Sequence, residues 1–285
     1  MMSSLENPVT DAVSFDAASP PRPAALCLVT AAAVEFKAVA GLLKDAVILH
    51  RQGLKLCRGK AGSQEVTVLI SEIGAPGFAD KLIAHLADNR YAAVLVIGLA
   101  GGLDAQLRTG EVVVYESCLR IEDPAERLAA GSSAGGEQFA GEEIARIRCD
   151  PEPVARLCAG LRSRNIRWRQ VNGLSFNRIV VNAADKRALN KHYGAAVVDM
   201  ETYQVLEVCA RFKVPGAAVR VVSDAAGHDL PDFNRALDCD GQMSGGRVAL
   251  AMLARPVAAL RFLLNLRRVM AALKQTAGAI PEVLA

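Results

Sequence analysis

The sequence lacks paired cysteines, is poor in aromatic residues and carries little net charge, and each deficit excludes a class of protein. Its seven cysteines stand singly, with no C-x-x-C pair and no Cys/His cluster at metal-ligand spacing. We therefore expect reduced thiols in a cytoplasmic protein that holds neither a metal ion nor another cofactor. Aromatic residues make up 5% of the chain and the net charge is +3, without dense Lys/Arg patches interleaved with aromatics. We therefore expect no nucleic-acid partner.

The amino-terminal segment, residues 1–23, also lacks the apolar run of a signal peptide. It contains acids and prolines, and we predict a disordered tail. The chain has 285 residues, of which 52% are hydrophobic, and this is enough to bury a sizeable core. We predict a single domain over 24–240, with a long Gly-, Ser- and Glu-rich loop at about 120–150, followed by basic amphipathic helices over 241–285.

Short apolar runs rich in β-branched residues alternate with stretches of helical periodicity. Several runs are continuous, as in strands that are covered on both faces. Helical spacing of apolar residues is clearest over 76–90 and 201–212. The pattern predicts an α/β fold with a mixed, largely parallel central sheet flanked by helices on both faces. The expected strands are 25–30, 65–71, 92–98, 111–117, 194–200 and 217–223.

The carboxyl-terminal stretch from Gly241 to Pro281 contains no acid. Its apolar helical pattern is interrupted at Arg255, Pro256 and Arg261, which excludes a membrane-spanning helix. Two interpretations stay open, and composition alone favours the second. A basic amphipathic helix can make peripheral contact with an anionic membrane, or it can pack its apolar face on the core and leave its arginines in solvent.

Two segments place chemistry-bearing residues at the ends of predicted strands, where ligands bind in α/β sheets. VVDMET (197–202) puts Glu201 at a helix start, where the helix dipole favours a carboxylate. Glu201 could hold the two hydroxyls of a sugar, or it could serve only as a first-turn acid. VRVVSDAAG (219–227) puts Arg220 inside an apolar strand and Asp224 at its end. Asp224 could act as a general acid, or Arg220 could form a structural ion pair with Asp224 or Asp199.

A third segment, VIGLAGGLDAQLRTGEVVV (96–114), has three glycines directly after a predicted strand. It has neither the G-x-G-x-x-G spacing of a dinucleotide site nor the Lys-Ser/Thr of a phosphate-binding loop. Alone it indicates a sharp turn or a close approach of the backbone to a ligand. Glu35, at the junction of the first strand and the first helix, is by itself a first-turn acid.

Taken together, GLAGGLDAQLRTGEVVV, VVDMET and RVVSD resemble, in this order and spacing, the purine nucleoside phosphorylase and nucleosidase superfamily. Its members cleave the N-glycosidic bond of nucleosides, and the resemblance covers about residues 25–230. DLPDFNRALDCDG (229–241), followed by the arginine-rich helices, is similar to the hopanoid-associated phosphorylase branch, the adenosylhopane nucleosidases. The resemblance implies a nucleoside phosphorylase-like fold, a small-molecule purine nucleoside as ligand, and a homo-oligomer.

The resemblance also implies roles for the acids of the motifs. Asp224, positioned by Ser223, would protonate or hydrogen-bond N7 of the purine. Met200 would pack on the sugar, and Glu201 would accept hydrogen bonds from the ribose hydroxyls and stabilise an oxocarbenium-like transition state. Asp199 would point away, as a structural partner.

The remaining roles concern the base and the nucleophile. The turn at Ala100 and Gly101 would lie beneath the base and sugar, and the backbone at Val180 would pair with the purine edge. Glu35 and Arg220 would direct a water molecule.

The sequence departs from the family pattern at two places. Leu99 stands where hydrolases of the family usually have a serine, and no arginine precedes the glycine turn, where phosphorylases have one. Because a phosphate dianion needs several donors, we favour water as the nucleophile and a 5′-substituted adenosine as the substrate. A phosphate-dependent phosphorylase and a catalytically inactive nucleoside-binding module remain the alternatives.

Overall fold

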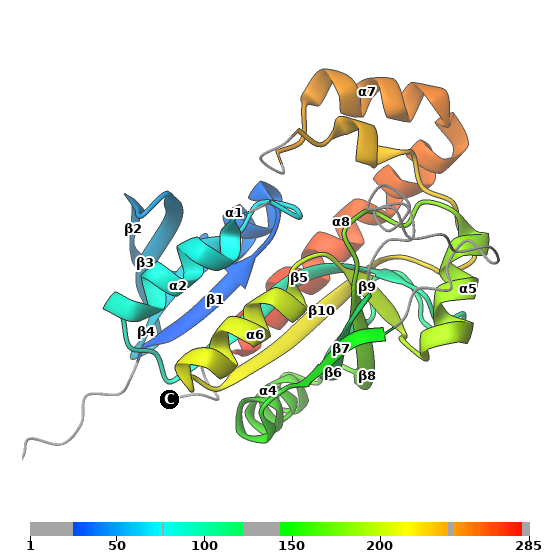
Figure 1. The fold of residues 1–285 in the computed structure, drawn as a ribbon. Coiled ribbons are helices and arrows are strands. Elements are labelled where there is room, and N and C mark those ends of the chain that lie inside the picture. The colour runs from blue at the N-terminus through cyan, green and yellow to red at the C-terminus, as the bar shows by residue number, and fades with distance from the viewer. Residues whose placement is uncertain (1–24, 76, 122–142, 239–241, 281–285) are drawn as a thin grey trace, which may run out of the picture.

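The computed structural model describes residues 25–75, 77–121, 143–238 and 242–280. The expected tail at 1–23 and most of the expected loop at 120–150 lie outside these residues. Within them, ten strands form one mixed sheet with helices on both faces, which confirms the predicted α/β class (Figure 1). The helices are α1 (Ala33–Ala40), α2 (Phe78–Asp88), α4 (Pro151–Ser163), α5 (Ala183–Tyr193), α6 (Thr202–Phe212), α7 (Gly245–Ala254) and α8 (Pro256–Ala279), with a short 3₁₀ helix η1 (Phe233–Ala236).

The sheet curls until part of it closes on itself. In spatial order its strands are β10 (Gly216–Asp224), β6 (Val112–Ile121), β8 (Trp168–Ser175), β9 (Val197–Asp199), β5 (Ala93–Gly102), β1 (Leu26–Thr30), β4 (Gln64–Ile70), β3 (Leu54–Ala61) and β2 (Lys44–Arg51), while β7 (Glu143–Arg148) pairs with β6. β10 also pairs with β5, so β5, β10, β6, β8 and β9 make a closed ring. Parallel pairings join β1 to β4 and β5, β5 to β10, and β8 to β6 and β9.

The six expected strands are all present, and the central ones are buried along their length. β1 is buried at every residue, as the continuous apolar run predicted. The expected strand 194–200 is shorter, because Gly194 adopts a left-handed conformation that ends α5, and pairing starts at Val197. Four strands were not expected. β2 is short of buried residues and begins and ends with charged side chains, β7 mixes charged with apolar residues, and β3 and β8 carry lysine, arginine or amide side chains.

The helices cover the sheet in two layers. α2 and α6 pack together on one face, while α1, α4 and α8 pack on the other. The second half of α8 buries Val269, Leu273 and Ala277 beneath β10 and α1, so this part of the carboxyl terminus packs on the core. α7 has no buried residue, and its main neighbours are η1 and α8. In the described part of the chain, no helix is long and apolar enough to cross a membrane.

Candidate active site

The parallel register of β5 and β10 brings the motifs together at the carboxyl ends of these strands. Arg220 lies opposite Gly98, and Asp224 lies opposite Gly101. β1 is the other parallel neighbour of β5, so the helix that follows β1, with Glu35 in its first turn, starts at the same edge. Residues separated by almost two hundred positions therefore meet at one place, as expected for a site in an α/β sheet.

Arg220 is the centre of a buried ionic network. Its side chain is 0% exposed, and its Nε donates to Asp199 Oδ2 at 3.1 Å. Its Nη2 donates to Glu201 Oε2 at 3.3 Å and to the Thr202 hydroxyl at 3.0 Å. The Arg220–Asp199 pair that sequence reasoning left open is therefore formed, and Glu201 shares the same cation. A charge removed from water in this way needs such partners.

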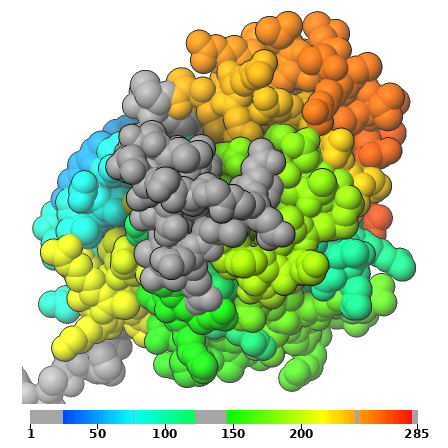
Figure 2. Space-filling view, turned by 45° about the vertical axis from the view of Figure 1, so that its right-hand side comes forward, coloured from blue at the N-terminus to red at the C-terminus, as the bar shows by residue number. Residues whose placement is uncertain are grey.

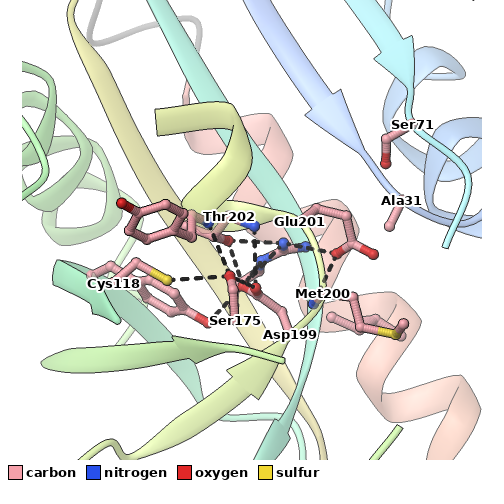
Figure 3. Close-up of polar contacts among 12 residues, drawn as sticks. Ala31, Ser71, Cys118, Ser175, Asp199, Met200, Glu201 and Thr202 are labelled. Carbon is pink, nitrogen blue, oxygen red and sulfur yellow. Dashed lines mark hydrogen bonds and ion pairs between the residues drawn. The ribbon is translucent and has the colours of Figure 1, made fainter. Parts of the chain in front are cut away.

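Asp199 is saturated with hydrogen bonds inside the protein. Oδ1 accepts from the Ser175 hydroxyl at 2.7 Å and from the backbone N–H of Thr202 at 3.1 Å. Oδ2 accepts from the Tyr115 hydroxyl at 2.9 Å, from the Thr202 hydroxyl and from Arg220. Figure 3 shows Asp199, Ser175 and Thr202 gathered on one side of the network, with the Glu201 side chain directed toward Ala31. Asp199 thus orients Arg220 and has no oxygen left for a ligand.

Glu201 is the N-cap residue, immediately before α6, but its side chain does not cap the helix. Its Oε1 accepts from the backbone N–H of Gly74 at 3.1 Å, and no side-chain cap bond is made. Burial raises the pKa of Glu201 to about 7, with Asp199 and Glu35 adding to the rise and Arg220 opposing it. The helix start was expected to favour the ionised form, but burial near two other carboxyl groups outweighs that effect.

Glu35 is held by backbone donors from the turn between β1 and α1 and from β5. Its Oε2 accepts from the N–H groups of Ala31 and Ala32, both at 2.9 Å, and its Oε1 accepts from the N–H of Leu99 at 2.8 Å. Arg220 Nη1 points into the same region and is a buried donor without a hydrogen-bond partner in the described chain. A donor left unpaired in this way costs stability, so the site is suited to a small oxygen ligand at this point.

Gly98 provides the space between these two groups. A Cβ atom there would lie 2.7 Å from Glu35 Oε2 and 2.8 Å from Arg220 Nη1. We expect Gly98→Ala to displace both side chains and to lower kcat/KM by about 100-fold or more, because small misplacements of catalytic groups are this costly. Gly246→Ala, which adds its Cβ into open space on α7, is the matched control. An unchanged kcat/KM for Gly98→Ala would show that this space is not used.

Asp224 is held by Ser223 on one side and by a lysine on the other. The Ser223 hydroxyl lies 2.5 Å from Asp224 Oδ1 and 3.1 Å from the carbonyl oxygen of Ala100. Lys186 Nζ lies 2.5 Å from Asp224 Oδ2, so the alternative Arg220–Asp224 pair is not formed. Sequence reasoning missed Lys186. The available signal was its spacing with Leu189 and Tyr193 on the buried face of α5.

The remaining predicted residues surround this centre. Met200 packs against Gly74, and Gly101 lies under Asp224, whose carboxylate oxygens would be 3.7 Å from an added Cβ. Val180 is buried in the apolar cluster that includes Val198. Both backbone groups of the preceding residue, Ile179, are bonded to the side chain of Asn234, so Ile179 is not free to pair with a base.

Comparisons with known proteins identify the family and the fold of the chain. The family model of the phosphorylase superfamily matches residues 25–253. The chain is 27% identical over 236 residues to the 5′-methylthioadenosine/S-adenosylhomocysteine nucleosidase of Glaesserella parasuis, covering 79% of this chain and 96% of that protein. The fold is similar to that of the Campylobacter jejuni nucleosidase of the same name (TM-score 0.66, 18% identity, 91% and 98% of the two chains). It is also similar to Helicobacter pylori futalosine hydrolase (TM-score 0.59, 20% identity, 85% and 97%).

Proposed function

The chain belongs to the phosphorylase superfamily, and from this premise we propose that it is a nucleosidase that hydrolyses a 5′-substituted adenosine and releases adenine. The observation that carries the proposal is that a site for a nucleophile and a candidate proton donor lie together at the carboxyl ends of β5 and β10. Arg220 Nη1, buried and without a hydrogen-bond partner among the described residues, faces Glu35 across Gly98, and Asp224 lies four residues further along β10. A small nucleophile and a proton donor would therefore stand on opposite sides of a glycosidic bond.

In this proposal, each group acts on a separate part of the substrate. Asp224 donates a proton toward N7, which makes adenine a better leaving group. Glu201 accepts hydrogen bonds from the ribose hydroxyls, and its negative charge stabilises the positive charge that develops on the sugar ring. Glu35 and Arg220 hold the water, and Glu35 accepts its proton as the new C–O bond forms.

The charges around the nucleophile position favour water over phosphate. Arg220 is already shared by Asp199 and Glu201, and Glu35 and Glu201 present two carboxyl groups to the same region. A phosphate dianion placed there would meet these groups with little net positive charge to balance it. Leu99 contributes its backbone N–H to Glu35, so the water would be held through the carboxylate and Arg220, without a serine hydroxyl.

The deciding assay follows free adenine from 5′-substituted adenosines, with and without phosphate. We expect adenine and a free sugar in both conditions. Release that requires phosphate and gives a sugar 1-phosphate would favour the phosphorylase alternative. Tight binding of adenine-containing ligands without turnover would favour the binding module.

The pKa of Glu201 gives a pH dependence that can be measured. Because the carboxylate must be ionised to accept two hydroxyl protons, kcat/KM should fall as the pH drops through about 7. Glu201→Gln should lower kcat/KM and remove this limb. The same shift should make the protein less stable as the pH rises from 4.5, the ordinary pKa, to about 7, since the folded state binds the proton more tightly. A wild-type profile that is flat between pH 5 and 8 would contradict the assignment.

We propose that the substrate carries a lipid-linked 5′ substituent, as in adenosylhopane, because of the surface of the carboxyl-terminal helices. Leu250, Leu253, Val257, Leu260 and Leu264 are all exposed, and Leu253 is 75% exposed. Figure 2 shows α7 and the start of α8 forming a raised lobe at one end of the molecule. The described residues of this segment, 242–280, contain basic residues and no acid. Exposed apolar side chains with positive charges suit an anionic membrane surface, and we include peripheral membrane contact in the proposal.

Vesicle sedimentation tests this contact. Full-length protein should bind phosphatidylcholine vesicles that contain phosphatidylglycerol and should bind weakly to phosphatidylcholine alone. Leu250→Ser combined with Leu253→Ser should weaken binding, whereas Leu42→Ser, an exposed leucine beyond the end of α1, should not. Equal binding by both variants would reject the lobe as the contact surface.

The proposal also includes a homo-oligomeric, cytoplasmic enzyme, as the family resemblance implies. Light scattering of the purified protein measures the oligomer directly. A monomer at all concentrations that support turnover would contradict this part of the proposal.

A further inference from the structure

Lys186 is the most deeply buried ammonium group among the described residues, and it has one carboxylate partner. Its side chain is 0% exposed, and its Nζ lies 2.5 Å from Asp224 Oδ2. The same nitrogen donates to the backbone carbonyl of His228 at 2.8 Å. A lysine in this position is costly to bury unless it is paired, so Asp224 is the group that retains it there.

The charged groups near this pair have partners of their own. The Arg220 guanidinium is bonded to Asp199 and Glu201, and neither contacts Lys186. At the start of α5, Asp229 accepts from the backbone N–H of Ala183, and Asp185 accepts from the Asn182 side chain. His228 faces Lys186 through its carbonyl oxygen, and its residue is exposed. Lys186 is therefore the charged group that contacts the Asp224 carboxylate directly, at Oδ2.

We infer that the Lys186–Asp224 pair, rather than Asp224 alone, is the proton donor for the leaving purine. This inference rests on the proposed function. In the resting pair the proton is on the ammonium and Asp224 is a carboxylate. As the glycosidic bond breaks, Lys186 Nζ gives its proton to Asp224, and Asp224 gives a proton to N7. The bond electrons remain on the purine, Lys186 is left as a neutral amine, and solvent later restores its proton.

The hydrogen bonds on Asp224 support these two roles, in which Lys186 supplies the proton and Asp224 passes it to the purine. The Ser223 hydroxyl is close to Oδ1 and also to the Ala100 carbonyl, which fixes the plane of the carboxyl group. Lys186 contacts Oδ2, so each oxygen has one protein partner. Lys186 is thus a positioning residue that acts on the substrate through Asp224, and a carboxylate held this way needs no proton of its own before the substrate binds.

The test compares two substrates with the full-length protein. A 5′-substituted adenosine needs a proton on its leaving group, whereas a 4-nitrophenyl riboside has a leaving group that departs without one. For Lys186→Met we expect a loss in kcat of about 100-fold on the nucleoside, the usual size of a general-acid contribution, with KM little changed. On the nitrophenyl riboside we expect less than about a threefold change by the same reasoning. Lys191→Met, an exposed lysine on α5, is the control.

Equal losses on both substrates would overturn the inference, because a structural role affects them alike. A wild type without turnover on either substrate would instead reject the proposed function itself. If Lys186→Met does not fold, Lys186→Gln and Lys186→Arg carry the same comparison. Adding Lys186→Met to Asp224→Asn should then cost little further activity, because two groups that act as one unit are not additive. Additive losses in this double variant would also overturn the inference.

Discussion

Arg220→Met is expected to produce the largest loss of folding stability of any single substitution in the site, about 3 to 5 kcal/mol. Arg220 is 0% exposed and is the cation shared by Asp199, Glu201 and the Thr202 hydroxyl. Methionine has similar length but no charge, so two buried carboxyl groups would lose their counter-ion. Denaturant unfolding followed by circular dichroism measures the effect, and turnover should be lost as well.

The matched control is Arg211→Met, the same substitution on the exposed side of α6. It should change the free energy of unfolding by less than about 0.5 kcal/mol, as surface substitutions usually do. If the two variants unfold at the same denaturant concentration, the ionic network contributes no net stability. Arg220 would then be retained for the nucleophile alone.

The largest loss of activity is expected from Asp224→Asn, about 10²- to 10⁴-fold in kcat/KM for adenine release. Asparagine keeps the size of the side chain and can still meet the Ser223 hydroxyl, but its amide cannot pass a proton from Lys186 to the purine. Single-turnover measurements of adenine release separate this loss from changes in binding. Asp80→Asn, an exposed aspartate on α2, should have no effect.

A smaller loss of kcat/KM in Asp224→Asn would contradict the role of Asp224 as the proton donor. If Asp224→Asn changes neither turnover nor ligand affinity, the purine does not lie against β10. Comparison with Glu201→Gln and Asp199→Asn then helps, because Glu201 is the residue proposed to bind the substrate, whereas each oxygen of Asp199 already accepts at least two hydrogen bonds from the protein. We expect Glu201→Gln to lower turnover more, and Asp199→Asn to lower stability more.

The sequence predicted those parts of the fold that depend on local apolar runs. β1, β5 and β10 are buried on both faces, and their composition reflects this. β8 was missed because its sequence, WRQVNGLS, is polar and contains Gly173. That glycine is required by a distant partner, since a Cβ there would lie 2.0 Å from the ring of Tyr115. The ring lies against the β8 backbone, and this contact is visible only after β6 and β8 have paired.

The site was predicted in the same way, by residues whose chemistry conflicts with their surroundings. Arg220 in an apolar strand and Glu201 after one could be identified because each is costly without a partner. The partners themselves are set by tertiary structure. Lys186 lies on α5 whereas Asp224 ends β10, and the bond between Glu35 and Leu99 depends on strand order. Sequence patterns identify a group that needs a partner, whereas the fold decides which partner it finds.

The closed ring of strands also sets the order in which a newly synthesised chain can become active. Among the described strands β10 is the last to leave the ribosome, yet it lies between β5 and β6 and carries both Arg220 and Asp224. Until it arrives, β5 has an open edge and Glu35 has no arginine opposite it. The apolar side chains beneath β10 are covered only when the second half of α8, which is synthesised later, packs on them. A chain that ends before β10 therefore lacks both Arg220 and Asp224 and leaves the β10 side of β5 unpaired.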